Sequence, residues 1–131
     1  MSFEVFVSDL RSVYSEAQLA DKTDSCRLTK SHLQRWSELL GLSKESVCTE
    51  IALYLALGFH RKELTFEFCD AIINDLFYTV VWSGNELPDL VDAVYEAFDF
   101  GEYIHQDRPD DDPVETFTRP MIAQIVEVRC F

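Results

Sequence analysis

The chain has 131 residues, of which 24 are acidic and 11 basic, so its formal net charge is −13. Its length fits one domain, and its apolar content of 47% excludes a disordered chain and suffices for a core. Only four glycines and four prolines are present, which favours helices over a turn-rich all-β fold.

Two helices are predicted in the first third of the chain. In the first, Phe3–Leu19, apolar residues recur three and four positions apart, as on one face of a helix. The polar residues 20–28 follow as a loop. Thr29 or Ser31 can cap a second helix, which Gly41 closes.

Two further helices carry most of the apolar residues. The third begins after Ser43 and is expected to end at Gly58; its second half is apolar nearly all round, which is typical of a buried helix. The fourth, 65–82, contains no glycine or proline, and its apolar residues cover about half of its circumference. Thr65 can cap it and Gly84 suits the left-handed position after its end. We expect the bundle to be organised around this helix.

A fifth helix is predicted to begin near Pro88, which fits a first helical turn. Its apolar stripe is formed by Leu87, Leu90, Val91, Val94, Tyr95 and Phe98, and its acids fall outside that stripe. Asp92 and Glu96 are like charges four residues apart, which costs a few tenths of a kcal/mol, and no base nearby in sequence offsets them. This unfavourable choice indicates that the acids face a partner.

The residues at about 100–117 are predicted to form an acidic loop, because Phe100–Asp112 has no helical period. Loops of this length inside a domain tend to be functional or disordered. Thr118 can then cap a last helix, which carries the apolar stripe Met121, Ile122, Ile125 and Val126.

The predicted fold is therefore all-α: one domain, 1–131, folded as a compact bundle of five or six helices around 65–82. Apolar residues also alternate in Phe3–Val7 and in Ile125–Cys130, so an α+β fold with a small terminal strand pair is the alternative. The four cysteines form no CxxC pair, which indicates reduced thiols. No secretory signal and no apolar run near ~18 residues is evident, so a cytoplasmic protein without a membrane span is expected.

No sequence motif of a known catalytic site is present, and the chain is not expected to be an enzyme. It lacks the GxSxG, P-loop, GxGxxG and HExxH patterns, and its three histidines are far apart. The run Asp110, Asp111, Asp112 lacks the alternating ligands, the central glycine and the final glutamate of a calcium loop. No cofactor and no specific metal site is predicted.

The negative charge is concentrated in one stretch. Residues 86–115 hold eleven acids and one base, Arg108, and so carry −10 of the chain's −13. Such a stretch repels nucleic acid and anionic membranes and attracts basic surfaces. The plainer alternative is a solvated face that only improves solubility. The oligomeric state is left open.

The small size and the acidic stretch, centred on Asp89, Asp92, Glu96, Asp99 and Asp107–Glu115, resemble those of bacterial toxin-immunity proteins. That resemblance implies an inhibitor that neutralises a cationic toxin, such as a nuclease, by covering or blocking its active site. Other interpretations are a helical adaptor or regulatory subunit that binds through an apolar groove, and a small-ligand-binding protein. The candidate partner-binding residues are Asp89, Asp92, Glu96, Asp99, Glu102, Tyr103, Asp107, Asp110, Asp111 and Asp112.

Overall fold

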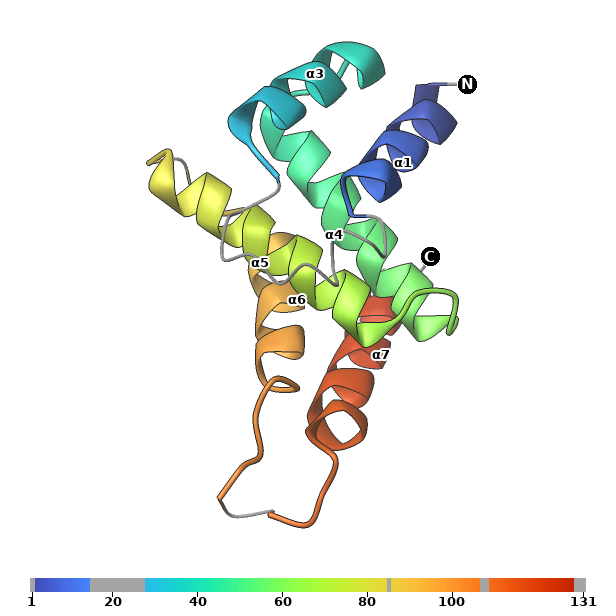
Figure 1. The fold of residues 1–131 in the computed structure, drawn as a ribbon, viewed down its shortest axis with the longest axis vertical. Coiled ribbons are helices and arrows are strands. Elements are labelled where there is room, and N and C mark those ends of the chain that lie inside the picture. Colours follow the sequence, from blue (N-terminus) through green and yellow to red (C-terminus); the bar gives the residue numbers. More distant parts are fainter. Residues whose placement is uncertain (1, 15–27, 85, 107–108, 129–131) are drawn as a thin grey trace.

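The part of the chain that the computed structural model describes comprises residues 2–14, 28–84, 86–106 and 109–128. It contains six α-helices and no strand, so the predicted all-α bundle is confirmed (Figure 1). The elements, in chain order, are α1 Ser2–Val13, α3 Lys30–Leu40, α4 Lys44–His60, α5 Phe66–Trp82, α6 Asp89–Asp99, a π-helical turn at Val114–Thr118, and α7 Arg119–Val128.

The alternative with a terminal strand pair is wrong. Phe3–Val7 lies inside α1, and residues 125–128 belong to α7, while 129 and 130 lie outside the described residues. The alternation near the N-terminus coincides with a longer helical period, which places Phe6 and Leu10 in the core. Of the predicted first helix, residues 15–19 lie outside the description.

The starts of the central helices follow the predicted chemistry. Ser43 Oγ accepts a hydrogen bond from the Ser46 backbone N–H at 3.1 Å, and Thr65 Oγ1 accepts one from Phe68 at 3.2 Å. Each hydroxyl satisfies a backbone donor that has no partner inside its helix. Gly84, just beyond α5, has a φ of +76°, a left-handed conformation that glycine adopts without strain. Local sequence therefore sets both ends of α5.

Gly58 does not end the third predicted helix, because α4 continues to His60. A Cβ on Gly58 would lie 2.3 Å from Leu64 Cδ1, so the missing side chain makes room for the chain that turns back after α4. The Gly58 carbonyl also accepts hydrogen bonds from the backbone N–H groups of Glu63 and Leu64, at 2.8 and 3.1 Å. Here glycine serves close packing rather than termination.

The centre of the bundle is formed by α4 and α5. Helix α4 packs against α3, α5, α6 and α7, and α5 packs against α4 and α6. The residues that α5 buries are Cys69, Ile72, Ile73, Leu76 and Val80. No helix in the described ranges is long and apolar enough to cross a membrane.

The two tryptophans lie in opposite environments. Trp36 of α3 is 0% exposed, and its ring meets that of Phe6 edge-to-face at a centroid distance of 5.3 Å. Its Nε1–H donates to Asp9 Oδ2 at 2.8 Å, which satisfies the one polar atom of the indole and joins α3 to α1. Trp82, the last residue of α5, is 82% exposed.

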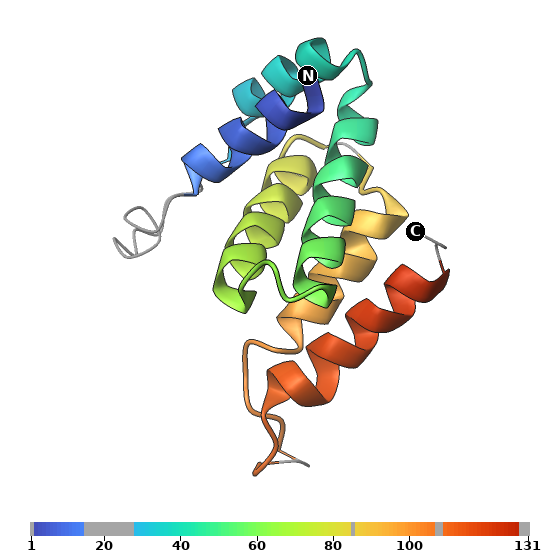
Figure 2. The same cartoon turned by 90° about the vertical axis from the view of Figure 1, so that its right-hand side faces the viewer.

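Helices α6 and α7 lie side by side, and the 100–118 connection joins them (Figure 2). Thr118 does not cap the last helix as predicted. It is the end of the π-helical turn and is fully buried, and its hydroxyl donates to the Ala97 carbonyl at 2.7 Å. The helical structure begins earlier, after Asp112, whose Oδ1 accepts from the Val114 backbone N–H at 3.0 Å. The loop between the two helices is therefore shorter than the sequence suggests.

Candidate functional site

The most exposed side of helix α6 carries acids. Its exposed residues are Asp89, Asp92 and Glu96, and every other residue of α6 is partly or wholly buried. These positions are three and four residues apart, so their side chains lie on one side of the helix. We call Asp89, Asp92 and Glu96 the acidic face.

The opposite side of α6 fixes this orientation. The residues that it buries are Leu90, Val91, Val94, Ala97 and Phe98. Tyr95 is partly buried, and its ring stacks on that of Phe77 of α5 at a centroid distance of 3.9 Å. The predicted apolar stripe is thus largely confirmed, with Ala97 added to it. Since the core side of α6 is packed, the helix cannot turn its acids inward without exposing that side.

The acids of α6 have no ion-pair partner in the described part of the chain. The two ion pairs found there among other elements are Arg35–Asp9 at 2.6 Å and Arg119–Glu115 at 2.8 Å. Asp92 and Glu96 therefore repel each other without compensation, at a cost of a few tenths of a kcal/mol. The acidic face is a concentration of charge that the fold does not neutralise.

Asp99 and Glu102 lie near the C-terminal end of α6 and approach α5. Asn74 of α5 donates from Nδ2 to Glu102 Oε2 at 2.9 Å and to Asp70 Oδ1 at 3.1 Å. Burial raises the pKa of Asp70 far above its usual range, and the hydrogen bond and charge of Glu102 raise it further. The charge of Asp99 acts in the same direction. The raised pKa favours the protonated, uncharged form of the Asp70 carboxyl.

The predicted site does not include Asp70 or Asn74. The only sequence signal for them was their place on the polar side of the 65–82 helix. Their pairing with Glu102 depends on the packing of α5 against α6, which brings together residues 28 and 32 positions apart. At this end of α6, Glu102 therefore has a hydrogen-bond partner on α5.

The remaining predicted residues lie in the connection between α6 and α7. Tyr103 is 48% exposed, and its ring lies 4.4 Å from that of His105. The His105 ring also lies 4.0 Å from that of Phe117, tilted by 37°, and its Nε2 is 2.9 Å from the Phe100 carbonyl oxygen. These contacts give His105 a structural role.

The acidic run of this connection lies apart from the acidic face. Asp110, Asp111 and Asp112 are exposed, in a segment that extends beyond the ends of α6 and α7 (Figure 1). Asp107 lies outside the described residues. The structure therefore brings Asp89, Asp92 and Glu96 together on one surface and leaves the aspartate run at the end of the loop.

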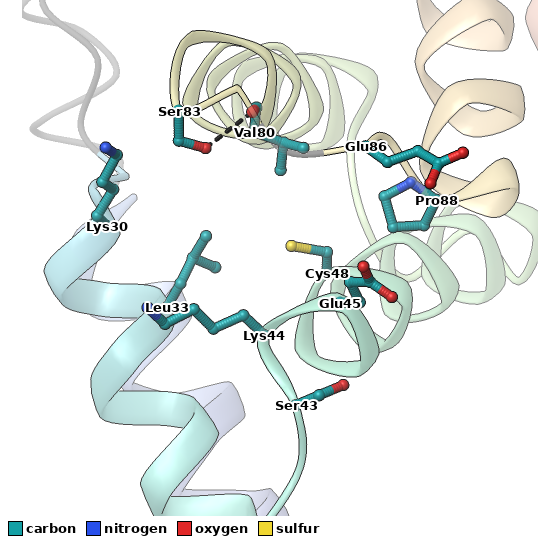
Figure 3. A pocket seen from close by; sticks show the side chains of 10 residues that line it. All are labelled: Lys30, Leu33, Ser43, Lys44, Glu45, Cys48, Val80, Ser83, Glu86 and Pro88. Carbon is teal, nitrogen blue, oxygen red and sulfur yellow. Dashed lines mark hydrogen bonds between the residues drawn. The ribbon is translucent and has the colours of Figure 1, made fainter.

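A cavity of about 630 Å³ lies between α3, α4, α5 and the segment before α6. Lys30 and Lys44 lie on one side of it and Glu45 and Glu86 on the other (Figure 3). Cys48, which is 3% exposed, lines its floor, and burial, reinforced by the charge of Glu45, raises the pKa of its thiol to about 11. A thiol in that state is a poor nucleophile at neutral pH.

No metal-binding arrangement is found in the residues described. None of their His, Cys, Asp and Glu side chains form a group of three or more that could hold a metal ion. The chain matches no protein-family model, no curated protein and no solved structure.

Proposed function

We propose that this chain is a protein-binding module, and specifically an immunity or inhibitor protein that neutralises a cationic toxin such as a nuclease. The acidic face of α6 is the surface that meets the toxin. The observation that carries the proposal is that every exposed residue of α6 is an acid and none of them has an ion-pair partner in the described chain.

A face that only aids solubility does not require this arrangement. Solubility is served as well by acids interspersed with bases, which stabilise a helix by pairing three or four residues apart. A row of unpaired acids instead attracts a basic partner and can raise association rates by ~10–10³ at low salt. The same field repels nucleic acid and anionic membranes, so the partner is a protein. Cys48 and Cys69 are free buried thiols, which supports a cytoplasmic setting.

One observation favours the second candidate, an adaptor that binds through apolar contacts. The exposed side of the C-terminal half of α5 carries Tyr78, Val81 and Trp82. Large exposed apolar residues that lie together often mark a binding surface. Binding through this surface would be nearly insensitive to salt, whereas binding through the acidic face weakens as salt screens it.

The test compares two variants with the same change in net charge. The first replaces the acidic face by amides: Asp89→Asn, Asp92→Asn, Glu96→Gln. The matched control changes three exposed acids on other elements: Glu4→Gln, Glu38→Gln, Glu63→Gln. Both variants should remain folded, because all six side chains are exposed, and circular dichroism checks this.

The first step is to look for a toxin gene beside the gene for this chain. Its product, purified separately, is the partner to be tested, with association rates measured at two salt concentrations. We expect the acidic-face variant to associate at least tenfold more slowly at low salt, and the control variant to associate nearly as fast as the original chain. Co-expression with the toxin should restore growth for the original chain and the control only. If association slowed equally in both variants, nonspecific net charge would be the cause, and the assignment of the binding surface to α6 would be overturned.

A further inference from the structure

A shallow groove runs along the seam between α6 and α7, directly beside the acidic face. It has a volume of about 300 Å³, and its lining residues are Leu90, Ala93, Glu96, Met121, Gln124, Ile125 and Val128. Five of these seven side chains are apolar. Glu96 belongs to both the groove and the acidic face, so the two surfaces are continuous.

Ala93 creates the hollow in this groove. It lies on α6 between the acidic face and the buried side, and it is partly exposed. Its single methyl group leaves space against Met121 and Ile125 of α7, both of which are also partly exposed. Val128 is 73% exposed and extends the apolar surface along α7. From Met121 to Val128 the groove is ~10 Å long, about two helical turns.

The described residues that line the groove carry charge of one sign only. Its lining contains no base, and the acids next to it on α6 are Asp89 and Asp92. Among the described bases, Arg119 at the start of α7 is the nearest in sequence to the α7 residues of the groove. It is paired with Glu115 and lies over the Phe59 ring at 4.4 Å. An occupant of the groove therefore meets apolar side chains on one side and unpaired carboxylates on the other.

We propose that the α6–α7 groove receives a basic amphipathic helix of the partner protein. The helix would place apolar side chains one turn apart in the hollow at Ala93, and its lysines or arginines would lie over the acidic face. Helices commonly bind such grooves through anchors at i and i+3 or i+4, and the length of this groove fits two such anchors. This inference rests on the proposed function and adds a specific apolar contact to it.

The inference separates two contributions to binding. The acidic face sets the approach of the partner and its sensitivity to salt. The groove sets the lifetime of the complex, because an apolar side chain is buried from water only in the bound state and must be exposed again on dissociation. A cationic partner without apolar anchors is attracted by the acidic face but does not fill the groove.

The test uses two synthetic helical peptides rich in lysine and alanine. One carries leucines one helical turn apart, and the other carries glutamines at those positions. Their affinities are measured by fluorescence anisotropy for the original chain, the amide variant of the acidic face, and Ala93→Leu. The control is Gln34→Leu, which adds an apolar side chain to an exposed position of α3.

For both the original chain and Gln34→Leu, we expect the affinity of the leucine peptide to be about tenfold higher than that of the glutamine peptide. In Ala93→Leu this preference should disappear, because leucine fills the hollow, while the weak binding of both peptides remains. If the two peptides bound the original chain with equal affinity and the amide variant bound neither, the groove would be refuted as a binding site. The acidic face would then remain the binding surface. If the amide variant bound the peptides as tightly as the original chain does, the acidic face would also be refuted as a binding surface.

Discussion

Replacing Asp70 by asparagine should make the protein more stable at neutral and alkaline pH. Asparagine has the same shape, has no charge, still accepts from Asn74, and can donate to Glu102. In the native chain, burial and the neighbouring Glu102 raise the pKa of Asp70 from 3.8 to about 9, which favours its protonated form. In the unfolded chain it ionises near its ordinary value.

The sign follows from these two values. A group whose pKa is higher in the folded state contributes stability that is fully present below the unfolded pKa, here about 4, and is lost as pH rises toward 9. A single proton gives at most ~1.4 kcal/mol per pH unit in that window. Asp70 is only partly buried, so water can reach the pair, and the effect is smaller. Between pH 5 and pH 8 we expect Asp70→Asn to gain about 1–2 kcal/mol relative to the original chain.

Other groups face Asp70 and must be considered in this titration. They are Glu102 in the loop, Asp99 and Tyr95 on α6, and Asn74 on α5. None of them is a base, so no cation compensates Asp70 when it ionises. The repulsion from Glu102 and Asp99 therefore adds to the cost of burial.

The measurement is urea unfolding at pH 5, 6.5 and 8, followed by circular dichroism. The matched control is Glu67→Gln, which removes an exposed carboxylate from the same helix. Its stability should differ from that of the original chain by an amount that does not change with pH over this range. If the difference between Asp70→Asn and the original chain were equally constant, Asp70 would be ionised in the folded protein and its raised pKa would be refuted.

Three further predictions concern buried residues of the core and of the connection between α6 and α7. Leu76→Ala should lower the free energy of unfolding by ~2–5 kcal/mol, because Leu76 is 0% exposed in the middle of α5; an unchanged melting temperature would contradict its packing. Gly101→Ala should cost ~1–3 kcal/mol, since the new Cβ would lie 2.2 Å from Thr118 Oγ1, and the loss would be read from thermal melts. The Cys48 thiol should resist alkylation at pH 7 and react quickly in urea, as mass spectrometry of its peptide would show; rapid labelling of the folded chain would refute its burial.

The fold was predictable where local chemistry decides it. The ends of α5 follow from Thr65 and Gly84, and the apolar stripe of α6 follows from its spacing. The prediction failed where a residue serves a distant contact. Gly58, predicted to end a helix, makes room for Leu64. Thr118, predicted to cap a helix, donates a hydrogen bond to the Ala97 carbonyl of α6. Nothing within a few residues of either position signals these roles.

The candidate site shows the same division. The acidic face was predictable because Asp92 and Glu96 lie on one helix, whose period places them together. The contact of Asn74 with both Asp70 and Glu102 was not, because it depends on how α5 and the segment after α6 are placed in three dimensions. The groove beside Glu96 also depends on α7, whose position relative to α6 no local pattern gives.

The contrast between the two tryptophans gives the protein two built-in optical reporters. Trp36, enclosed beside Phe6 and bonded to Asp9, should emit at short wavelength and shift to the red only when α1 and α3 separate. Trp82, at the exposed end of α5, should emit at long wavelength throughout and be quenched by acrylamide in the folded chain. A single emission spectrum can therefore be divided into a signal from the α1–α3 contact and a signal from the surface, without any label.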